Sequence, residues 1–248
     1  FNTERKRNDI GEEFRFLVKV LIVVGIPSIL TFIEPDTGAV LIYFIITIVM
    51  LFTAGFRNRW FIATIGIIVL LGSAFLAVYF LDGDLFIKIF GTSFFYRMDR
   101  ILNWSNSSGL QLTNSITAIG SAGPLGHGFN HTPIYFPEMQ TDFIFAVFAS
   151  NFGFIGVLIL ISLLIYFDLN IISLSSKTTN SYDKFTVGGV ISVLLFQQIQ
   201  NISMTIGLLP IMGITLPFVS YGGSSLLSYM ILIGMLFNIS NEKLRFKN

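Results

Sequence analysis

The run Pro137-Glu138-Met139-Gln140-Thr141-Asp142 places two carboxylates directly before an apolar stretch that begins at Phe143. A charge at the centre of a membrane span costs roughly 2.5–3.5 kcal/mol on insertion scales, so an acid beside a span is usually kept for function or pairing. Asp142 is therefore a candidate functional residue. An alternative stays open, because Asp is a favoured N-cap and could simply begin the helix, which stabilises it by about 1 kcal/mol.

The composition places this carboxylate in a membrane protein. Of the 248 residues, 53% are hydrophobic and 12% are charged, whereas soluble domains are roughly 25% charged. The predicted fold class is therefore all-α, a polytopic helical membrane protein. The chain has no cysteine, which excludes disulfides, thiolate metal sites and cysteine nucleophiles. The net charge is +1 and no basic patch interleaved with aromatics occurs, so we expect no nucleic-acid partner.

Apolar runs long enough to cross about 30 Å of hydrocarbon predict the membrane spans. We expect six of them, at residues 14–33, 39–56, 60–80, 143–167, 185–206 and 224–240. They form one predicted membrane domain over 1–248, with a long loop at 81–141. Residues 1–11 are polar and basic without the apolar core of a signal peptide, so we expect the chain to begin inside a longer protein.

The basic residues predict the orientation of these spans, because short cytoplasmic loops accumulate Lys and Arg. Most basic residues fall on segments that an alternating topology places on one side: Arg5, Lys6, Arg7, Arg57, Arg59, Lys177, Lys184, Lys243, Arg245 and Lys247. The loop at 81–141 holds Lys88, Arg97 and Arg100 alone. We therefore expect this loop to be external and Asp142 to face outward.

Two parts of the long loop differ in character. Apolar residues recur at helix-like spacing over 85–95, which predicts a helix lying on the bilayer surface. Residues 109–130 are rich in Gly, Ser, Thr and Asn, which predicts a segment without regular structure. His127 and His131 lie four residues apart, but no acidic partner at matching spacing accompanies them, so we predict no metal site.

Polar groups also lie in and after the fifth span. Gln197, Gln200 and Asn201 share one helical face. They either make interhelical hydrogen bonds, worth about 0.6 kcal/mol each, or line a polar substrate cavity. The following segment, 207–225, contains four glycines and two prolines and cannot form a regular helix. Irregular backbone at membrane depth needs protein or a wet cavity around it, so we expect this segment to fold back toward the same cavity.

Taken together, these motifs resemble the SEDS family (shape, elongation, division and sporulation), whose members include RodA and FtsW. The resemblance rests on Glu34-Pro35-Asp36-Thr37-Gly38, Arg100, Ala118-Ile119-Gly120-Ser121, Gly126-x-Gly128, Pro137-Glu138, Thr141-Asp142-Phe143-Ile144-Phe145, Asn201, Gly207-Leu208-Leu209-Pro210 and Leu216-Pro217-Phe218-x-Ser220-Tyr221-Gly222-Gly223-Ser224-Ser225. The chain departs from the family pattern at Gln140, Ser150-Asn151, Ser203 and Met212. A His and two acids are lost there, which weakens any proton relay through those positions.

The resemblance implies a ten-span peptidoglycan glycosyltransferase of the bacterial cytoplasmic membrane. Such an enzyme polymerises lipid II for cell-wall growth in cell shape or division, beside a class B penicillin-binding transpeptidase. Six spans would be present here, so full activity is expected to need further N-terminal helices. The resemblance also implies that Asp142 is the catalytic base and that Arg100, Glu138, Thr141, Asn201, Ser220 and Tyr221 bind substrate. The polar face of the fifth span adds Gln200 to the predicted substrate-binding residues.

The implied reaction is an inverting transfer, in which a sugar hydroxyl attacks an anomeric carbon that carries a lipid-linked pyrophosphate. Asp has an ordinary pKa near 3.9, and partial burial would raise it and make the carboxylate a stronger proton acceptor. Arg100, or a divalent cation, would offset the charge of the pyrophosphate. We expect no other cofactor.

Two other functions use many of the same parts: a flippase for lipid II, and a scaffold that recruits a transpeptidase without catalysis. A flippase needs a polar path to the cytoplasmic side. We expect no charged residue deep in the last three spans, and this absence, together with Asp142 at the external end, favours a polymerase.

The predicted topology can be tested with single cysteines, since the chain has none of its own. A cysteine at Asn106 should be labelled from outside intact cells by a membrane-impermeant maleimide, and one at Asn180 should not. The reverse pattern would overturn the orientation.

Overall fold

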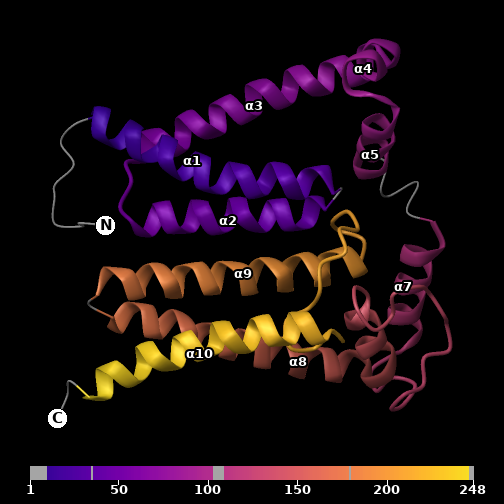
Figure 1. The fold of residues 1–248 in the computed structure, drawn as a ribbon. Helices are drawn as coiled ribbons and strands as arrows, with labels where there is room; N and C mark the ends of the chain where they lie inside the picture. Colours follow the sequence, from indigo (N-terminus) through magenta and orange to yellow (C-terminus); the bar gives the residue numbers. More distant parts are fainter. Residues whose placement is uncertain (1–9, 35, 103–108, 179, 246–248) are drawn as a thin grey trace. The chain divides into compact units, whose positions relative to one another are not determined.

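The computed structural model describes residues 10–34, 36–102, 109–178 and 180–245, and all regular structure in these ranges is α-helical (Figure 1). The helices are α1 (Ile10–Ile33), α2 (Thr37–Thr53), α3 (Asn58–Leu81), α4 (Gly83–Phe90), α5 (Thr92–Leu102), α7 (Gly109–Ser121), α8 (Ile144–Lys177), α9 (Ser181–Thr205) and α10 (Gly223–Arg245). Each predicted span coincides with one helix to within a few residues, except that α8 continues ten residues beyond its predicted end.

Among the described residues, five helices are long and apolar enough to cross a membrane: α1, α3, α8, α9 and α10. The remaining predicted span is α2, a shorter apolar helix of 17 residues. This length lies at the lower limit for a spanning helix, which needs about 17–25 residues. The chain is thus a multi-pass helical membrane protein, as its composition predicts.

The chain divides into two compact units. One comprises Phe1–Ala54 and Leu110–Asn248, and the other comprises Gly55–Gly109. The first contains Asp142 and the polar face of α9, and the second contains the segment with Arg97 and Arg100. The single membrane domain predicted over 1–248 stays a prediction.

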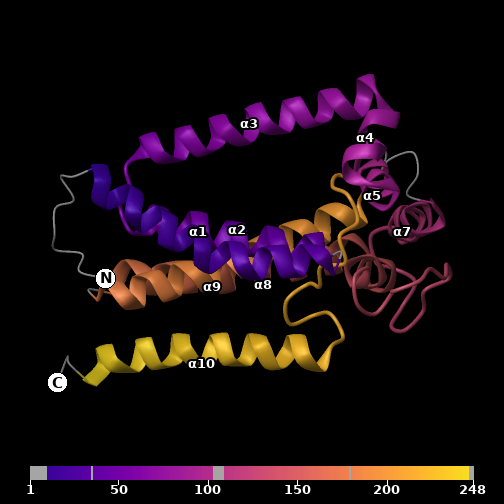
Figure 2. The ribbon, with the colours of Figure 1, turned by 45° about the horizontal axis from the view of Figure 1, so that its top comes forward.

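In the larger unit, α9 is the central helix and packs against α2 on one side and α8 on the other. Gly188 and Gly189 allow α2 to approach closely, because a Cβ at Gly188 would lie 3.2 Å from Thr53 Oγ1. The start of α1, the end of α8 and the end of α10 lie at one end of this unit, whereas α7 and residues 207–222 lie at the other (Figures 1 and 2). This is the arrangement that alternating spans require.

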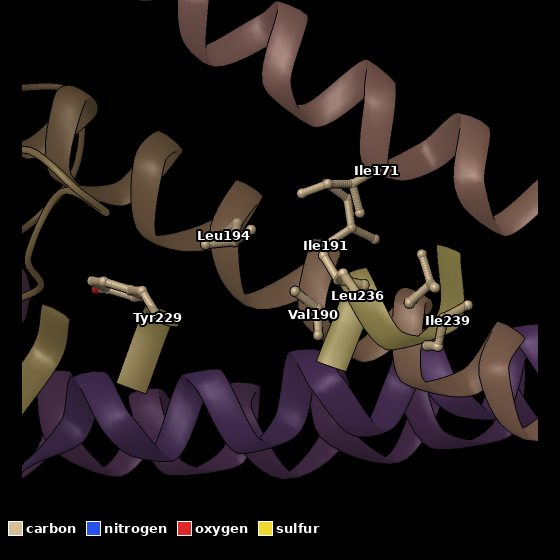
Figure 3. Close-up of a cluster of buried hydrophobic side chains, with 8 residues drawn as sticks. Ile171, Val190, Ile191, Leu194, Tyr229, Leu236 and Ile239 are labelled. Carbon is tan, nitrogen blue, oxygen red and sulfur yellow. The ribbon is translucent and has the colours of Figure 1, made fainter. Parts of the chain in front are cut away.

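A cluster of buried apolar side chains joins α8, α9 and α10 (Figure 3). Its members are Ile171 from α8, Val187, Val190, Ile191 and Leu194 from α9, and Tyr229, Leu236 and Ile239 from α10. Lipid is as apolar as these side chains, so close van der Waals packing stabilises their contact. The cluster keeps the three helices together, and its member Tyr229 also contacts the irregular segment after α9 through Thr215.

The smaller unit corrects one prediction. The apolar spacing over 85–95 forms two short helices, α4 and α5, because Gly91 has φ 87° and ends α4. Asp82 begins α4 by accepting a hydrogen bond from Leu85 N at 2.9 Å. Phe86 is fully buried among the rings of Phe75, Tyr79, Phe90, Phe94 and Phe95. The two helices therefore fold over α3, with Phe86 buried and Phe94 and Phe95 half-buried against its rings, while Phe90 and Tyr96 stay exposed. Their predicted place on the bilayer surface stays a prediction.

The expectation that 109–130 lacks regular structure is wrong over its first half, where α7 runs from Gly109 to Ser121. The small polar residues tolerate a helix there because their hydroxyls are satisfied. Ser115 is fully buried and its Oγ donates to Thr205 O at 2.9 Å, which ties α7 to the end of α9.

Residues 123–128 of the glycine-rich segment fit against a break in α8. Gly153 interrupts the helix with φ 64° and ψ −165°. The segment caps both halves of α8 by four backbone bonds: His127 N to Ser150 O at 2.9 Å, Gly128 N to Asn151 O at 3.1 Å, Phe154 N to Gly123 O at 3.0 Å, and Ile155 N to Pro124 O at 3.1 Å. The groups that the break would leave unsatisfied are thereby paired.

Gly153 should therefore resist substitution. Gly153→Ala forces a side chain into a conformation that is essentially confined to glycine, and its Cβ would lie 2.3 Å from the backbone N of Gly126. We expect at least about 2 kcal/mol of destabilisation, measured as a lower thermal unfolding midpoint of the full-length parent in detergent. Gly234→Ala in α10 is the matched control, because nothing lies within 4 Å of its Cβ position. Equal midpoints for both variants would contradict the interlocked break.

Candidate active site

Three consecutive backbone carbonyls, those of Gln140, Thr141 and Asp142, each accept a hydrogen bond from a distant part of the chain. Tyr221 N donates to Gln140 O at 2.8 Å, Ser220 Oγ to Thr141 O at 2.7 Å, and Asn201 Nδ2 to Asp142 O at 2.7 Å. We call these three donors the carbonyl clamp. It joins the turn before α8 to α9 and to the irregular segment after α9.

Asn201 is fully buried within the clamp. Its Nδ2 also donates to Ile214 O at 2.7 Å, so the two amide protons bridge carbonyls from two segments. Its Oδ1 has no hydrogen-bond partner among the described residues. A buried unsatisfied acceptor costs about 1–3 kcal/mol, so the side chain is held where its donors are used and its acceptor is not.

The Asp142 carboxylate is free of the capping role. The N-cap of α8 is Phe143, which has no side-chain cap bond, so the alternative that Asp142 merely begins the helix is wrong. The carboxylate instead lies beside Gly213, where a Cβ would be 3.5 Å from Asp142 Oδ2. Gly213 has φ 65°, which favours glycine. The irregular segment therefore passes the half-buried carboxylate without a side chain in between.

The surroundings of Asp142 favour proton uptake. Burial raises the pKa of its carboxyl above the ordinary value, and the nearby Glu138 carboxylate raises that pKa further, while the neighbouring Thr141 hydroxyl lowers it by less. The ionised carboxylate is therefore a better proton acceptor than an exposed Asp.

The turn that carries Asp142 is anchored and strained. Phe136 and Phe143 are buried, with ring centroids 5.8 Å apart. Glu138 has φ 56°, its O accepts from Phe143 N at 3.1 Å, and its Oε2 accepts from Thr141 Oγ1 at 2.9 Å. A non-glycine residue in the left-handed region is uncommon and persists where neighbouring structure enforces it. Thr141 thus orients Glu138 beside Asp142.

The acidic turn at 34–38 supports the same segment from α2. Asp36 caps α2, with its Oδ1 accepting from Ala39 N at 3.0 Å. A Cβ at Gly38 would lie 2.9 Å from Met212 O and 3.0 Å from the Ile214 side chain, so only glycine permits this approach. Pro35 lies outside the described residues.

The other predicted substrate-binding residues fall into different settings. The side chain of Gln200 is buried and its Nε2 donates to Pro210 O at 2.9 Å. Ser220 Oγ also accepts from Leu216 N at 2.8 Å, whereas the Tyr221 side chain is 74% exposed beside the turn. The structure thus brings Asp142, Glu138, Thr141 and the clamp together. The Arg100 side chain lies outside the description, and substrate contact by any of these residues stays a prediction.

The side-chain amides of α9 bond buried groups of neighbouring segments. This agrees with the first of the two alternatives, in which they make hydrogen bonds between helices. Besides the bonds above, Tyr229 OH lies 3.0 Å from both Gln197 Oε1 and Thr215 Oγ1, which connects α9, α10 and the irregular segment.

Asp168 was missed by the sequence reasoning. It is buried in α8, and its Oδ1 accepts from Gln198 Nε2 at 3.2 Å. The prediction that no charged residue lies deep in the last three spans is therefore wrong. The predicted span ended at residue 167, although the apolar run resumes directly after Asp168 and could have shown that the helix continues.

A metal centre has no support from side chains in the described ranges, where no three or more His, Asp or Glu residues gather to hold an ion. His127 Nδ1 lies 3.1 Å from Ser150 O, so this ring belongs to the capped break in α8.

Comparisons with known proteins agree with this architecture. The family model described as "Cell cycle protein", which unites FtsW, RodA and SpoVE, matches residues 2–245. The chain is 35% identical over 98% of its length to "Probable peptidoglycan glycosyltransferase FtsW" of Buchnera aphidicola subsp. Baizongia pistaciae, covering 63% of that protein. It is 34% identical over 97% of its length to "Stage V sporulation protein E" of Bacillus subtilis, covering 64% of it.

A solved structure shows the same fold. It is titled "Structural coordination of polymerization and crosslinking by a peptidoglycan synthase complex" and superposes with a TM-score of 0.68 at 26% identity, covering 89% of this chain and 59% of that one. The chain therefore spans somewhat under two thirds of the length of its relatives. With nearly its whole length matched, this chain belongs to the FtsW, RodA and SpoVE family, the SEDS proteins.

Proposed function

We propose that the full-length protein polymerises lipid II into glycan strands, with Asp142 as the general base. The hydroxyl of one sugar attacks the anomeric carbon of another, whose bond to the lipid-linked pyrophosphate breaks with inversion. The hydroxyl proton passes to the Asp142 carboxylate, and the pyrophosphate leaves with the electron pair. Arg100 is the cation we assign to the leaving group, on the family resemblance.

The observation that carries this proposal is a carboxylate with a raised pKa whose backbone is held by the carbonyl clamp and which caps no helix. A positioned general base typically accelerates a reaction by about 10²–10⁴-fold. The relative from Buchnera aphidicola carries the name probable peptidoglycan glycosyltransferase, and the similar structure belongs to a peptidoglycan synthase complex. The family resemblance adds a class B penicillin-binding transpeptidase as partner and the outer face of the cytoplasmic membrane as the place of the reaction.

Lipid II transport is the second candidate, and Asp168 with Gln198 favours it, because these residues place buried polar groups inside the helical bundle. The names of the relatives favour polymerisation. A purified protein that forms glycan strands in detergent, where no bilayer separates two sides, is a polymerase regardless of any transport.

Asp142→Asn separates catalysis from folding. The amide cannot accept the proton, so polymerisation of lipid II by the full-length parent should fall by about 10²–10⁴-fold. Folding raises the pKa of Asp142, so ionisation is less favourable in the folded than in the unfolded state and its charge lowers the stability at neutral pH; a neutral Asn should leave the unfolding midpoint equal or higher. Near-parental polymerisation would contradict the assignment of the base.

Glu138→Gln should shift the pH dependence. As a base, Asp142 loses activity when pH falls through its pKa, which the Glu138 charge raises. Removing that charge lowers the pKa of Asp142, so the acidic limb of kcat/KM should move to lower pH, with a milder loss of rate than in Asp142→Asn. An unmoved or upward-shifted limb would show that the two carboxylates do not interact.

A further inference from the structure

We infer that Asn201 is a positioning residue for Asp142, acting through the backbone carbonyl of that residue and not through contact with substrate. The inference rests on the proposed function, since it assigns Asn201 a part in the same transfer.

The Asn201 side chain is too buried, and its amide hydrogens are too fully bonded, for it to contact the substrate. Asn201 is fully buried, and both hydrogens of its Nδ2 are used, on Asp142 O and on Ile214 O. A fully buried side chain cannot reach a sugar or a pyrophosphate. An amide NH2 whose two hydrogens are already bonded cannot donate to either of them. Its remaining polar atom, Oδ1, is an acceptor without a partner among the described residues, and an acceptor has no affinity for a pyrophosphate oxygen.

An Asn amide is the group best suited to join the backbone carbonyls of Asp142 and Ile214. Two buried carbonyls from separate segments meet at one side chain, and only a neutral group with two N–H donors joins them without adding charge. A hydroxyl satisfies one carbonyl, and a carboxylate satisfies neither. Ile214 follows Gly213, the residue beside the Asp142 carboxylate. Asn201 thus fixes both the backbone that carries the base and the segment that faces it.

The test is a double-mutant cycle on lipid II polymerisation by the full-length parent. Asn201→Ala should lower kcat by about 10- to 100-fold, as expected for a misplaced reacting group, with KM for lipid II little changed. Asn201→Asp has the same shape and loses both donors, so its loss should be at least as large. Asn201→Ser retains one donor and should be intermediate, which keeps the test valid if the alanine variant folds poorly.

The decisive comparison is Asn201→Ala in the Asp142→Asn background. A residue that acts only through Asp142 causes little further loss once the base is gone, because coupled residues are not additive. An undiminished additional loss, or a raised KM as the main effect of Asn201→Ala, would overturn the inference and leave the proposed function standing. A normal rate for Asp142→Asn alone would instead contradict the proposed function.

Gln198→Ala is the matched control for loss of a buried amide on α9. Its Nε2 donates to Asp168 Oδ1 at 3.2 Å, and it is not one of the three clamp donors. Any fold-loss in polymerisation rate that Gln198→Ala causes should be the same in the parent and in the Asp142→Asn background, as expected of general destabilisation. A cycle for Gln198 that resembles the cycle for Asn201 would show that the coupling is not specific to the clamp.

Discussion

Hydrogen bonds to three consecutive carbonyls constrain the turn before α8, and the rest of the larger unit is arranged so that their donors can reach it. Asn201 comes from α9, while Ser220 and Tyr221 come from the irregular segment. That segment reaches the turn only because Gly38 lets it approach α2 and because Gly213 leaves room beside the carboxylate. The apolar cluster of α8, α9 and α10 keeps the helices in place behind these contacts.

The site holds features that oppose local stability. Glu138 and Phe218 are non-glycine residues with φ of 56° and 65°, and the Asn201 Oδ1 is buried without a partner among the described residues. The pKa of Asp142 is raised, so its ionised form is disfavoured by folding. Such features persist where surrounding packing enforces them, and they gather at functional sites. Their concentration around one carboxylate supports a role for it beyond structure.

Hydropathy located the spans because length and apolarity are local properties, and the same holds for the position of Asp142 before α8. The clamp could not be predicted, since its bonded residues lie 59 and 79 residues apart and a backbone carbonyl has no sequence signal. The composition of 109–121 suggested a loop, but a bond from Ser115 to Thr205, 90 residues away, stabilises a helix. Asp168 ended a predicted span although Gln198 satisfies it inside the bundle.

The claim that the irregular segment holds the Asp142 turn can be measured directly with a pair of cysteines. The variant to make is a full-length parent whose only cysteines are Gln140→Cys and Tyr221→Cys. The backbones of these two residues share a 2.8 Å hydrogen bond. Mild oxidation should form a disulfide, read as a mass change in the peptide digest. The pair Gln140→Cys with Asn180→Cys should form none, because these residues flank opposite ends of α8. Failure of the first pair to cross-link, with both thiols still reactive to maleimide, would contradict the account.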